Sequence, residues 1–108
     1  MFSRYAYFVG KAVNGASAAL LEQLHICTLG YATLPKVLSA RLEVPVHLDP
    51  SAPEVFACIR MTFENAEDID VALASAQRDV VRAGVVKNVL PLFEGTVHHI
   101  AFRDYDAA

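Results

Sequence analysis

Four histidines carry the first candidate chemistry in this sequence, because histidine changes its charge near neutral pH and can move protons. His98 and His99 are adjacent, and neighbouring residues of an extended strand point to opposite faces, so the two cannot chelate one ion together. No aspartate or glutamate lies at ligand spacing from them, and we expect no metal site. His25, His98 and His99 remain candidate proton carriers, and the alternative for His25 is a partly exposed helix residue.

The arginines and tyrosines offer binding chemistry. The planar guanidinium of Arg60 could hold a substrate carboxylate, or it could pair with Glu43. Tyr5 and Tyr7 could line a small-molecule pocket, or each could be a core tyrosine with one satisfied hydroxyl group. A pocket between helices and sheet would have an aliphatic strand face as its floor. The candidate ligand-binding residues are Tyr5, Tyr7, His25 and Met61.

The sequence shows no motif for covalent or phosphate chemistry. It contains no nucleophile elbow, no phosphate-binding loop and no CxxC pair, and we expect no cofactor. Cys27 and Cys58 fall inside a predicted helix and a predicted strand, which favours free, buried and inert thiols. Two such cysteines, with an N-terminus unlike a signal peptide, favour a reducing compartment, by default the cytoplasm.

The elements that would position these residues follow a strand–helix–strand order that occurs twice. Val55–Phe63 is the strongest strand signal, aliphatic on one face and mixed on the other. The predicted elements are strands over 3–9, 37–48, Val55–Phe63 and 96–103, and helices over 17–29 and 66–83. This order predicts one α+β domain over residues 1–108, a ferredoxin-like βαββαβ fold with two helices on one face of a four-stranded antiparallel sheet. Right-handed crossovers place the first and third strands in the centre.

Cap residues set the predicted ends of the two helices. Ser17 is placed to cap the first helix, because its hydroxyl can accept a hydrogen bond from the first turn, and Gly30 is placed to end it. Asn65 and Gly84 do the same for the second helix.

Glycine and proline mark the predicted ends of the strands. Gly10 closes the first strand and Gly95 opens the last. Pro45 has no N–H to give to a ladder, so its strand should be an edge strand or bulged there. Residues 85–93 are apolar but broken by Pro91, which fits either a short helix or a packed loop.

The composition indicates a partner. The chain is 55% hydrophobic, more than 108 residues can bury alone, and no run approaches the roughly 20 apolar residues of a membrane helix. The net charge is −3 with no basic stripe, so nucleic acid is not expected. The sheet face away from the helices is aromatic and charged, which favours a homodimer through that face. Its predicted residues are Arg4, Phe8, Arg41, Phe56, Arg60, His98 and Phe102, and a one-residue slip would exchange His98 for His99.

Two short motifs accompany this element order and chain length. His25 in the first helix is followed by Leu34-Pro35, and residues 93–99 have the sequence FEGTVHH. With these features the chain resembles the EthD-type proteins, named for ethyl tert-butyl ether degradation, of the dimeric α/β-barrel superfamily. In EthD-type chains a glycine follows the Leu-Pro pair, and this sequence has Lys36 there. The resemblance implies a homodimer beside an oxidative degradation pathway.

Three functions fit these expectations. The first is an EthD-like homodimer that binds a small apolar or aromatic molecule between helices and sheet. The second is a cofactor-independent monooxygenase, isomerase or lyase on the same scaffold, with His25 and one of His98 or His99 as proton carriers. The third is a regulatory ligand-binding module of ACT type, which shares the βαββαβ order but aligns the sheets of two chains side by side.

Overall fold

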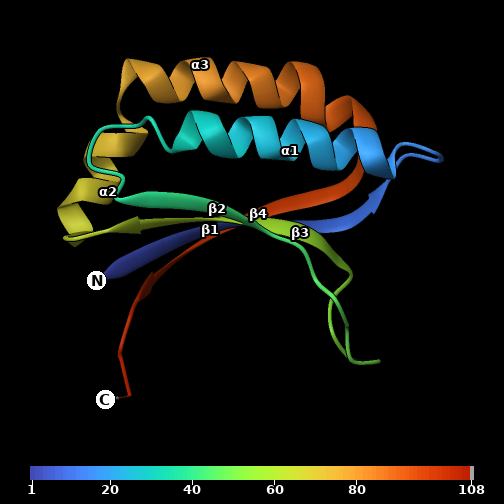
Figure 1. Cartoon of the computed structure of the whole chain (residues 1–108), viewed down its shortest axis with the longest axis horizontal. Coiled ribbons are helices and arrows are strands. Elements are labelled where there is room, and N and C mark those ends of the chain that lie inside the picture. The colour runs from blue at the N-terminus through green and yellow to red at the C-terminus, as the bar shows by residue number, and fades with distance from the viewer. Residues whose placement is uncertain (108) are drawn as a thin grey trace.

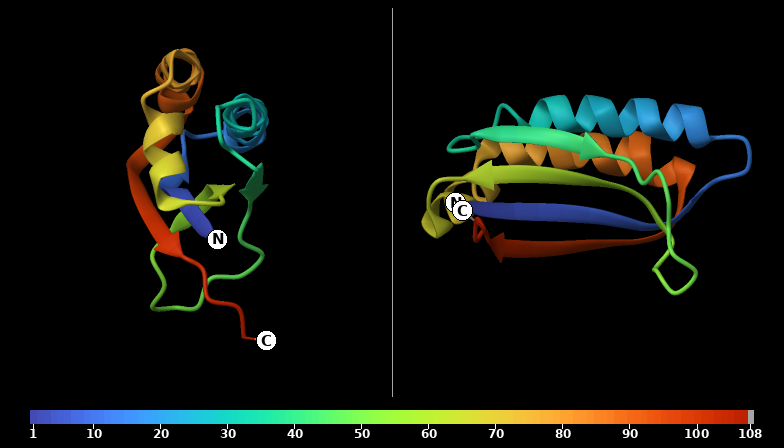
Figure 2. Two further views of the ribbon diagram at one scale, coloured as in Figure 1. Left: turned by 90° about the vertical axis from the view of Figure 1, so that its left-hand side faces the viewer. Right: turned by 60° about the horizontal axis from the view of Figure 1, so that its bottom comes forward.

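The computed structural model describes residues 1–107, which form an antiparallel sheet with its helices on one side (Figure 1). Two long helices lie side by side over the sheet, and the opposite sheet face is left open (Figures 1 and 2). The elements are β1 (Phe2–Ala12), α1 (Ser17–Tyr31), β2 (Ser39–Glu43), β3 (Val55–Phe63), α2 (Ala66–Leu73), α3 (Ala76–Gly84), a π-turn (Val85–Val89), a 3-10 turn (Leu90–Leu92) and β4 (Phe93–Arg103). No helix within residues 1–107 combines the length and apolar character needed to cross a membrane.

The sheet order is β2-β3-β1-β4, and all its neighbouring strands are antiparallel. This confirms the predicted α+β, ferredoxin-like architecture with β1 and β3 in the centre. The core between sheet and helices holds two clusters of buried side chains. Leu20 and Leu24 of α1 pack on Phe8 and Ile59, while Phe63 packs near Ile69 and Val81 of the second crossover.

The predicted phase of the first strand is wrong. Arg4 pairs with Met61 and Phe8 with Ala57, so Arg4 and Phe8 share the helix-covered face with these aliphatic residues of β3. Tyr5 and Tyr7 therefore lie on the open face. Both faces of β1 carry aromatic residues, so its alternation alone could not distinguish them.

Phe56 departs from its predicted face because of a bulge. The register of β1 and β3 pairs Phe8 with Ala57 and Val9 with Val55, so Phe56 is an extra residue with no partner of its own. It packs against the core cluster that contains Phe8. The remaining open-face predictions hold: Arg41 lies opposite Arg60, His98 opposite Tyr7 and Phe102 opposite Ser3.

The second crossover is two helices, where one was predicted. Ser75 has an extended backbone and its hydroxyl accepts a hydrogen bond from the Arg78 N–H at 3.2 Å, so it caps a new helix. α3 ends at Gly84, as predicted, but Gly84 keeps a right-handed φ of −63° and the chain continues directly into the π-turn and the 3-10 turn that precede β4. The short-helix alternative for residues 85–93 is thus the one that occurs.

Other predicted caps and element ends also differ from the structure. Gly30 lies inside α1, where an added Cβ would stand 3.0 Å from Val81 Cγ2, so this glycine lets α1 and α3 approach closely. Ser17 begins α1 but does not cap it; Ala16 holds the cap position without a side-chain hydrogen bond, and Asn65 likewise caps α2 by position only. The second strand stops at Glu43, before Pro45, and a long loop to β3 follows.

Gly10 and Gly95 lie opposite each other within β1 and β4, where sequence patterning had predicted strand ends. Their φ angles are +145° and +155°. A Cβ added at Gly95 would stand 2.1 Å from the Val9 carbonyl oxygen, and one at Gly10 would stand 2.1 Å from the Glu94 oxygen. Only glycine allows the two backbones to meet this closely.

We expect Gly95→Ala to lower the free energy of unfolding by about 3 kcal/mol or more, because it adds a backbone clash to a disallowed φ. Gly15→Ala is the matched control: Gly15 also has a positive φ, +79°, but open space around it, so the loss should be about 1 kcal/mol. Urea denaturation of both variants measures the difference. Equal losses would contradict a special role for the Gly10–Gly95 pair.

Candidate functional site

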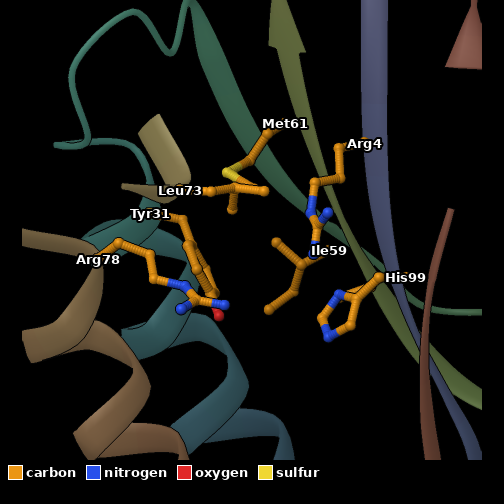
Figure 3. Close-up of a pocket in the computed structure, with 8 residues that line it drawn as sticks. Arg4, Tyr31, Ile59, Met61, Leu73, Arg78 and His99 are labelled. Carbon is orange, nitrogen blue, oxygen red and sulfur yellow. The ribbon is translucent and has the colours of Figure 1, made fainter. Parts of the chain in front are cut away.

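Two adjoining cavities lie between the sheet and the helices. The smaller holds about 20 Å³ and the larger about 160 Å³. Ala6, Tyr31, Arg78 and His99 line both of them, so the two form one site. We call this the helix–sheet cavity; Figure 3 shows its smaller part, with side chains from sheet and helices converging on it.

The polar side chains of the cavity come from both the sheet and the helices. Arg4 extends from the central strand β1, and His99 from β4, directly opposite the small Ala6. Tyr31 is the last residue of α1, and Arg78 lies beside it from α3 (Figure 3). Because Ala6 has only a methyl group, the space in front of β1 stays open.

Apolar side chains form the rest of the cavity wall. Ile59, Met61 and Leu73 line its smaller part. The residues that line the larger part include Phe8, Val85, Val86, Leu90 and Val97. A small molecule would therefore meet an apolar surface together with basic groups that come from β1 and α3.

The arginines and acidic residues are unevenly represented in the lining of the cavity. Three arginines line it, Arg4, Arg78 and Arg82, and no aspartate or glutamate does. Within residues 1–107, none of the three forms an ion pair. Burial, and secondarily the charge of Arg78, lowers the pKa of Arg4 from its usual value. The site thus holds positive charge without a counter-charge from the described residues 1–107.

Two further titratable groups respond to this field. Burial lowers the pKa of His99, and the positive charges of Arg4, Arg78 and Arg82, with a contribution from His98, lower it further. Burial, and then Cys27, raises the pKa of Tyr31, although the arginines oppose this rise. At neutral pH the cavity therefore presents a neutral imidazole that can accept a proton and a phenol that can donate a hydrogen bond.

The structure brings only some predicted site residues to the cavity. Met61 and His99 line it, as does Arg4, which had been assigned to the dimer interface. His25 lies on the exposed side of α1 and lines neither part of the cavity. Tyr5 and Tyr7, predicted for the same pocket, lie on the opposite side of the sheet.

The open sheet face is a second feature of the molecule. Tyr5 and Tyr7 stack with their ring centroids 5.1 Å apart, and Phe102 meets Tyr5 edge-on. The side chains of Ile100 and Phe102 are 45% and 40% exposed. Large apolar side chains exposed together on one face often mark a contact with a partner. The β2–β3 loop and residues 104–107 extend beyond the sheet on this side (Figure 1).

Arg60 is held by the tail of the chain and not by Glu43. Its Nη2 donates to Ser3 Oγ at 3.1 Å and lies 3.8 Å from an Asp104 carboxylate oxygen, while Arg41 pairs with Glu43 at 2.7 Å. The guanidinium also lies 6.0 Å from the Tyr5 ring centroid, and its Nε is buried without a partner. Arg60 therefore organises the open face, with no route to the helix–sheet cavity.

Neither cysteine is built for nucleophilic chemistry. Burial, with a contribution from nearby Glu43, raises the pKa of Cys58 to about 11, and burial raises that of Cys27. Both thiols are free and buried. Their thiolate forms are scarce at neutral pH, which agrees with the expectation that they are inert.

Sequence patterning missed Tyr31, Arg78 and Arg82 as site residues. Both arginines lie near the end of the predicted helix over 66–83, where basic residues ordinarily favour the helix dipole. One available signal was their spacing: like charges four residues apart on a helix destabilise it unless something offsets them. Tyr31 gave no signal, because only the length of α1 brings it to the cavity.

The backbone of the Leu34-Pro35-Lys36 segment resembles the EthD-type pattern even though Lys36 replaces its glycine. Leu34 is buried in the core, and Lys36 has a φ of +70°, the left-handed conformation that glycine adopts most easily. The backbone geometry is therefore the one that a glycine would favour, although the side chain at this position differs.

No family model matches the sequence, and no curated protein matches it significantly. Solved structures do match the fold. An ethyl tert-butyl ether degradation (EthD) family protein from Bacillus halodurans has a TM-score of 0.72 at 11% identity, over 97% of this chain and 99% of that one. A putative antibiotic biosynthesis monooxygenase from Deinococcus radiodurans has a TM-score of 0.63 at 13% identity, over 100% and 96%.

A third similar structure bears on assembly. It is a dimeric protein of unknown function and ferredoxin-like fold from Bacteroides fragilis, with a TM-score of 0.64 at 6% identity, over 95% of each chain. At these identities the likeness concerns the fold alone. The chain has the ferredoxin-like fold shared by EthD-family and antibiotic biosynthesis monooxygenase-like proteins, as the resemblance in its sequence implies.

Proposed function

We propose that this protein is a homodimer that pairs through its open sheet face and binds a small apolar or aromatic molecule in the helix–sheet cavity. The single observation that carries the binding role is the cavity itself, apolar on most of its wall, with polar groups converging from β1, β4, α1 and α3. A cavity of about 150 Å³ accommodates a benzene-sized molecule, close to the 160 Å³ of the larger part. The EthD-family protein of the same fold supports a place beside a degradation pathway.

The open face supports the dimer. It carries aromatic and aliphatic side chains on β1 and the edge strand β4, and charged groups on β3 and the opposite edge strand β2, so an apolar half of the face adjoins a charged half, the mixture found at interfaces. The dimeric Bacteroides protein shows that this fold can assemble. Pairing of two such faces would cover Tyr5, Tyr7 and Phe102, and with them the excess of exposed hydrophobic surface.

We expect Ile100→Glu to weaken the dimer at least about tenfold, because it would bury an unpaired charge within the apolar half of the open face, opposite Tyr5. Val80→Glu is the matched control, since Val80 lies on α3 and is also exposed. Light scattering after gel filtration at micromolar concentrations measures both. A dimer that survives Ile100→Glu would favour side-by-side pairing of sheets, as in ACT modules, and a wild-type monomer would remove the dimer altogether.

The binding role predicts that filling the cavity abolishes binding. We expect Val97→Phe, which projects a ring into the larger part, to lower the affinity for single-ring aromatic probes at least about tenfold. Val71→Phe, on the exposed side of α2, should bind as the wild type does. Amide chemical shifts of the ¹⁵N-labelled protein, titrated with benzyl alcohol and benzoate, report both affinity and location. Shifts that avoid Ala6 and His99, or that persist in Val97→Phe, would refute this cavity as the site.

A second candidate is a cofactor-independent enzyme on the same scaffold, favoured by the neutral His99 beside Tyr31 in the cavity. Such an imidazole could take a proton from a bound phenol or carbon acid. We expect turnover of quinol-like substrates, followed by oxygen uptake or absorbance, to be lost in His99→Asn. It should survive in His98→Asn, whose ring lies on the open face opposite Tyr7. The reverse pattern would exclude His99 as the proton carrier.

A further inference from the structure

We infer that the ligand of the helix–sheet cavity is an organic carboxylate with a single-ring or short aliphatic body, held by Arg4, Arg78 and Arg82. This inference rests on the proposed binding function and names its ligand class.

The three arginines of the cavity lack a counter-charge within residues 1–107. Arg4 and Arg78 are half-buried, Arg82 stands at the rim, and none of the three has an acidic partner within residues 1–107. The other ion pairs of the chain show that its arginines take carboxylate partners where these are near: Arg41 takes Glu43, and Arg60 takes Asp104. Half-buried charges of one sign repel each other, and an anion in their midst would remove that cost.

Arg78 and Arg82 are both placed on α3. Arg78 and Arg82 are four residues apart and line the same cavity, so they lie on one face of the helix. Arg4 extends from β1 on the other side of the cavity from Arg78 (Figure 3). Guanidinium groups from two sides of a cavity can each donate a fork of hydrogen bonds to the two oxygens of a carboxylate.

The apolar wall of the cavity favours an organic anion over an inorganic one. A small inorganic anion would be satisfied by the arginines but would leave Phe8, Val85 and Val97 facing empty space. The volume of the larger part limits the apolar body to about the size of one ring. Tyr31, which stays protonated at neutral pH, can donate a further hydrogen bond to the same anion.

His99 couples this binding to protons. The groups around it are Arg4 on β1, Tyr31 on α1, Arg78 and Arg82 on α3, and His98 on its own strand. Burial and these positive charges lower its pKa in the empty site. A bound carboxylate adds negative charge and raises that pKa again, so binding takes up a proton and the affinity grows as the pH falls through this range.

Isothermal titration calorimetry with matched acids and amides tests the inference. We expect the protein to bind benzoate and hexanoate at least about tenfold more tightly than benzamide and hexanamide, because only the acids carry the charge. Arg78→Gln should remove at least about tenfold of the benzoate affinity, and Arg82→Gln should do so if Arg78→Gln unfolds. Arg103→Gln is the control, since Arg103 stacks on Phe2 at the far end of β4.

The outcomes separate this inference from the function it rests on. If amides and acids bind equally, the carboxylate assignment is wrong and the binding function stands. If inorganic phosphate binds as tightly as benzoate, the assignment of an organic body is wrong. If no probe binds, the proposed function fails and this inference with it.

The pH dependence of benzoate affinity tests the role of His99, because a purely structural role of this residue would not change it. Between about pH 8 and about pH 6, benzoate stays ionised, since carboxylic acids lose their proton near pH 4. Its affinity should rise over this interval in the wild type and stay flat in His99→Asn. A slope that is unchanged in His99→Asn would contradict the coupling to this histidine.

Discussion

The register of β1 between β3 and β4 is the constraint on which the rest of this structure depends. Because side chains alternate along a strand, a slip of one residue in β1 would exchange Arg4 for Tyr5 on the cavity side, and a slip of one residue in β4 would exchange His99 for His98. The cavity would then lose its basic groups and the open face its aromatic ones. The contact of Gly10 with Gly95 holds this register, since no other pair of residues could pass so closely.

The residues around the cavity are not the ones that would make the fold most stable. A small apolar residue in place of Arg4 would pack against Ile59 and Met61 without any desolvated charge, and acidic residues near α3 would neutralise Arg78 and Arg82. Neither occurs. Local departures from the most stable arrangement are common at functional sites, where the cost is recovered when the ligand binds.

Hydrophobic periodicity and turn residues were enough to predict the order of elements, the sheet and the side on which the helices lie. The strongly patterned β3 was predicted with its bounds, whereas β1 was placed in the wrong phase because both of its faces carry aromatic residues. The cavity could not be predicted, since it depends on which face each residue of β1 occupies. It also depends on the helix break at Ser75, after which α3 begins and carries Arg78 and Arg82. Glycine misled in a consistent way: Gly10, Gly30 and Gly95 serve close approach inside elements, and a single sequence cannot distinguish that use from a boundary.

The two faces of the sheet can serve separate tasks because β1 and β3 contribute to both. Ala6 and Ile59 face the cavity, while Tyr7 and Cys58, one position along the same strands, face the other side. A sheet is thin, so a partner pressed on the open face would restrain the strands that carry Arg4 and His99. Assembly would in this way fix the spacing between the strand arginine and the two helix arginines. Dimer formation and ligand affinity should therefore be linked, although no side chain of the open face touches the cavity.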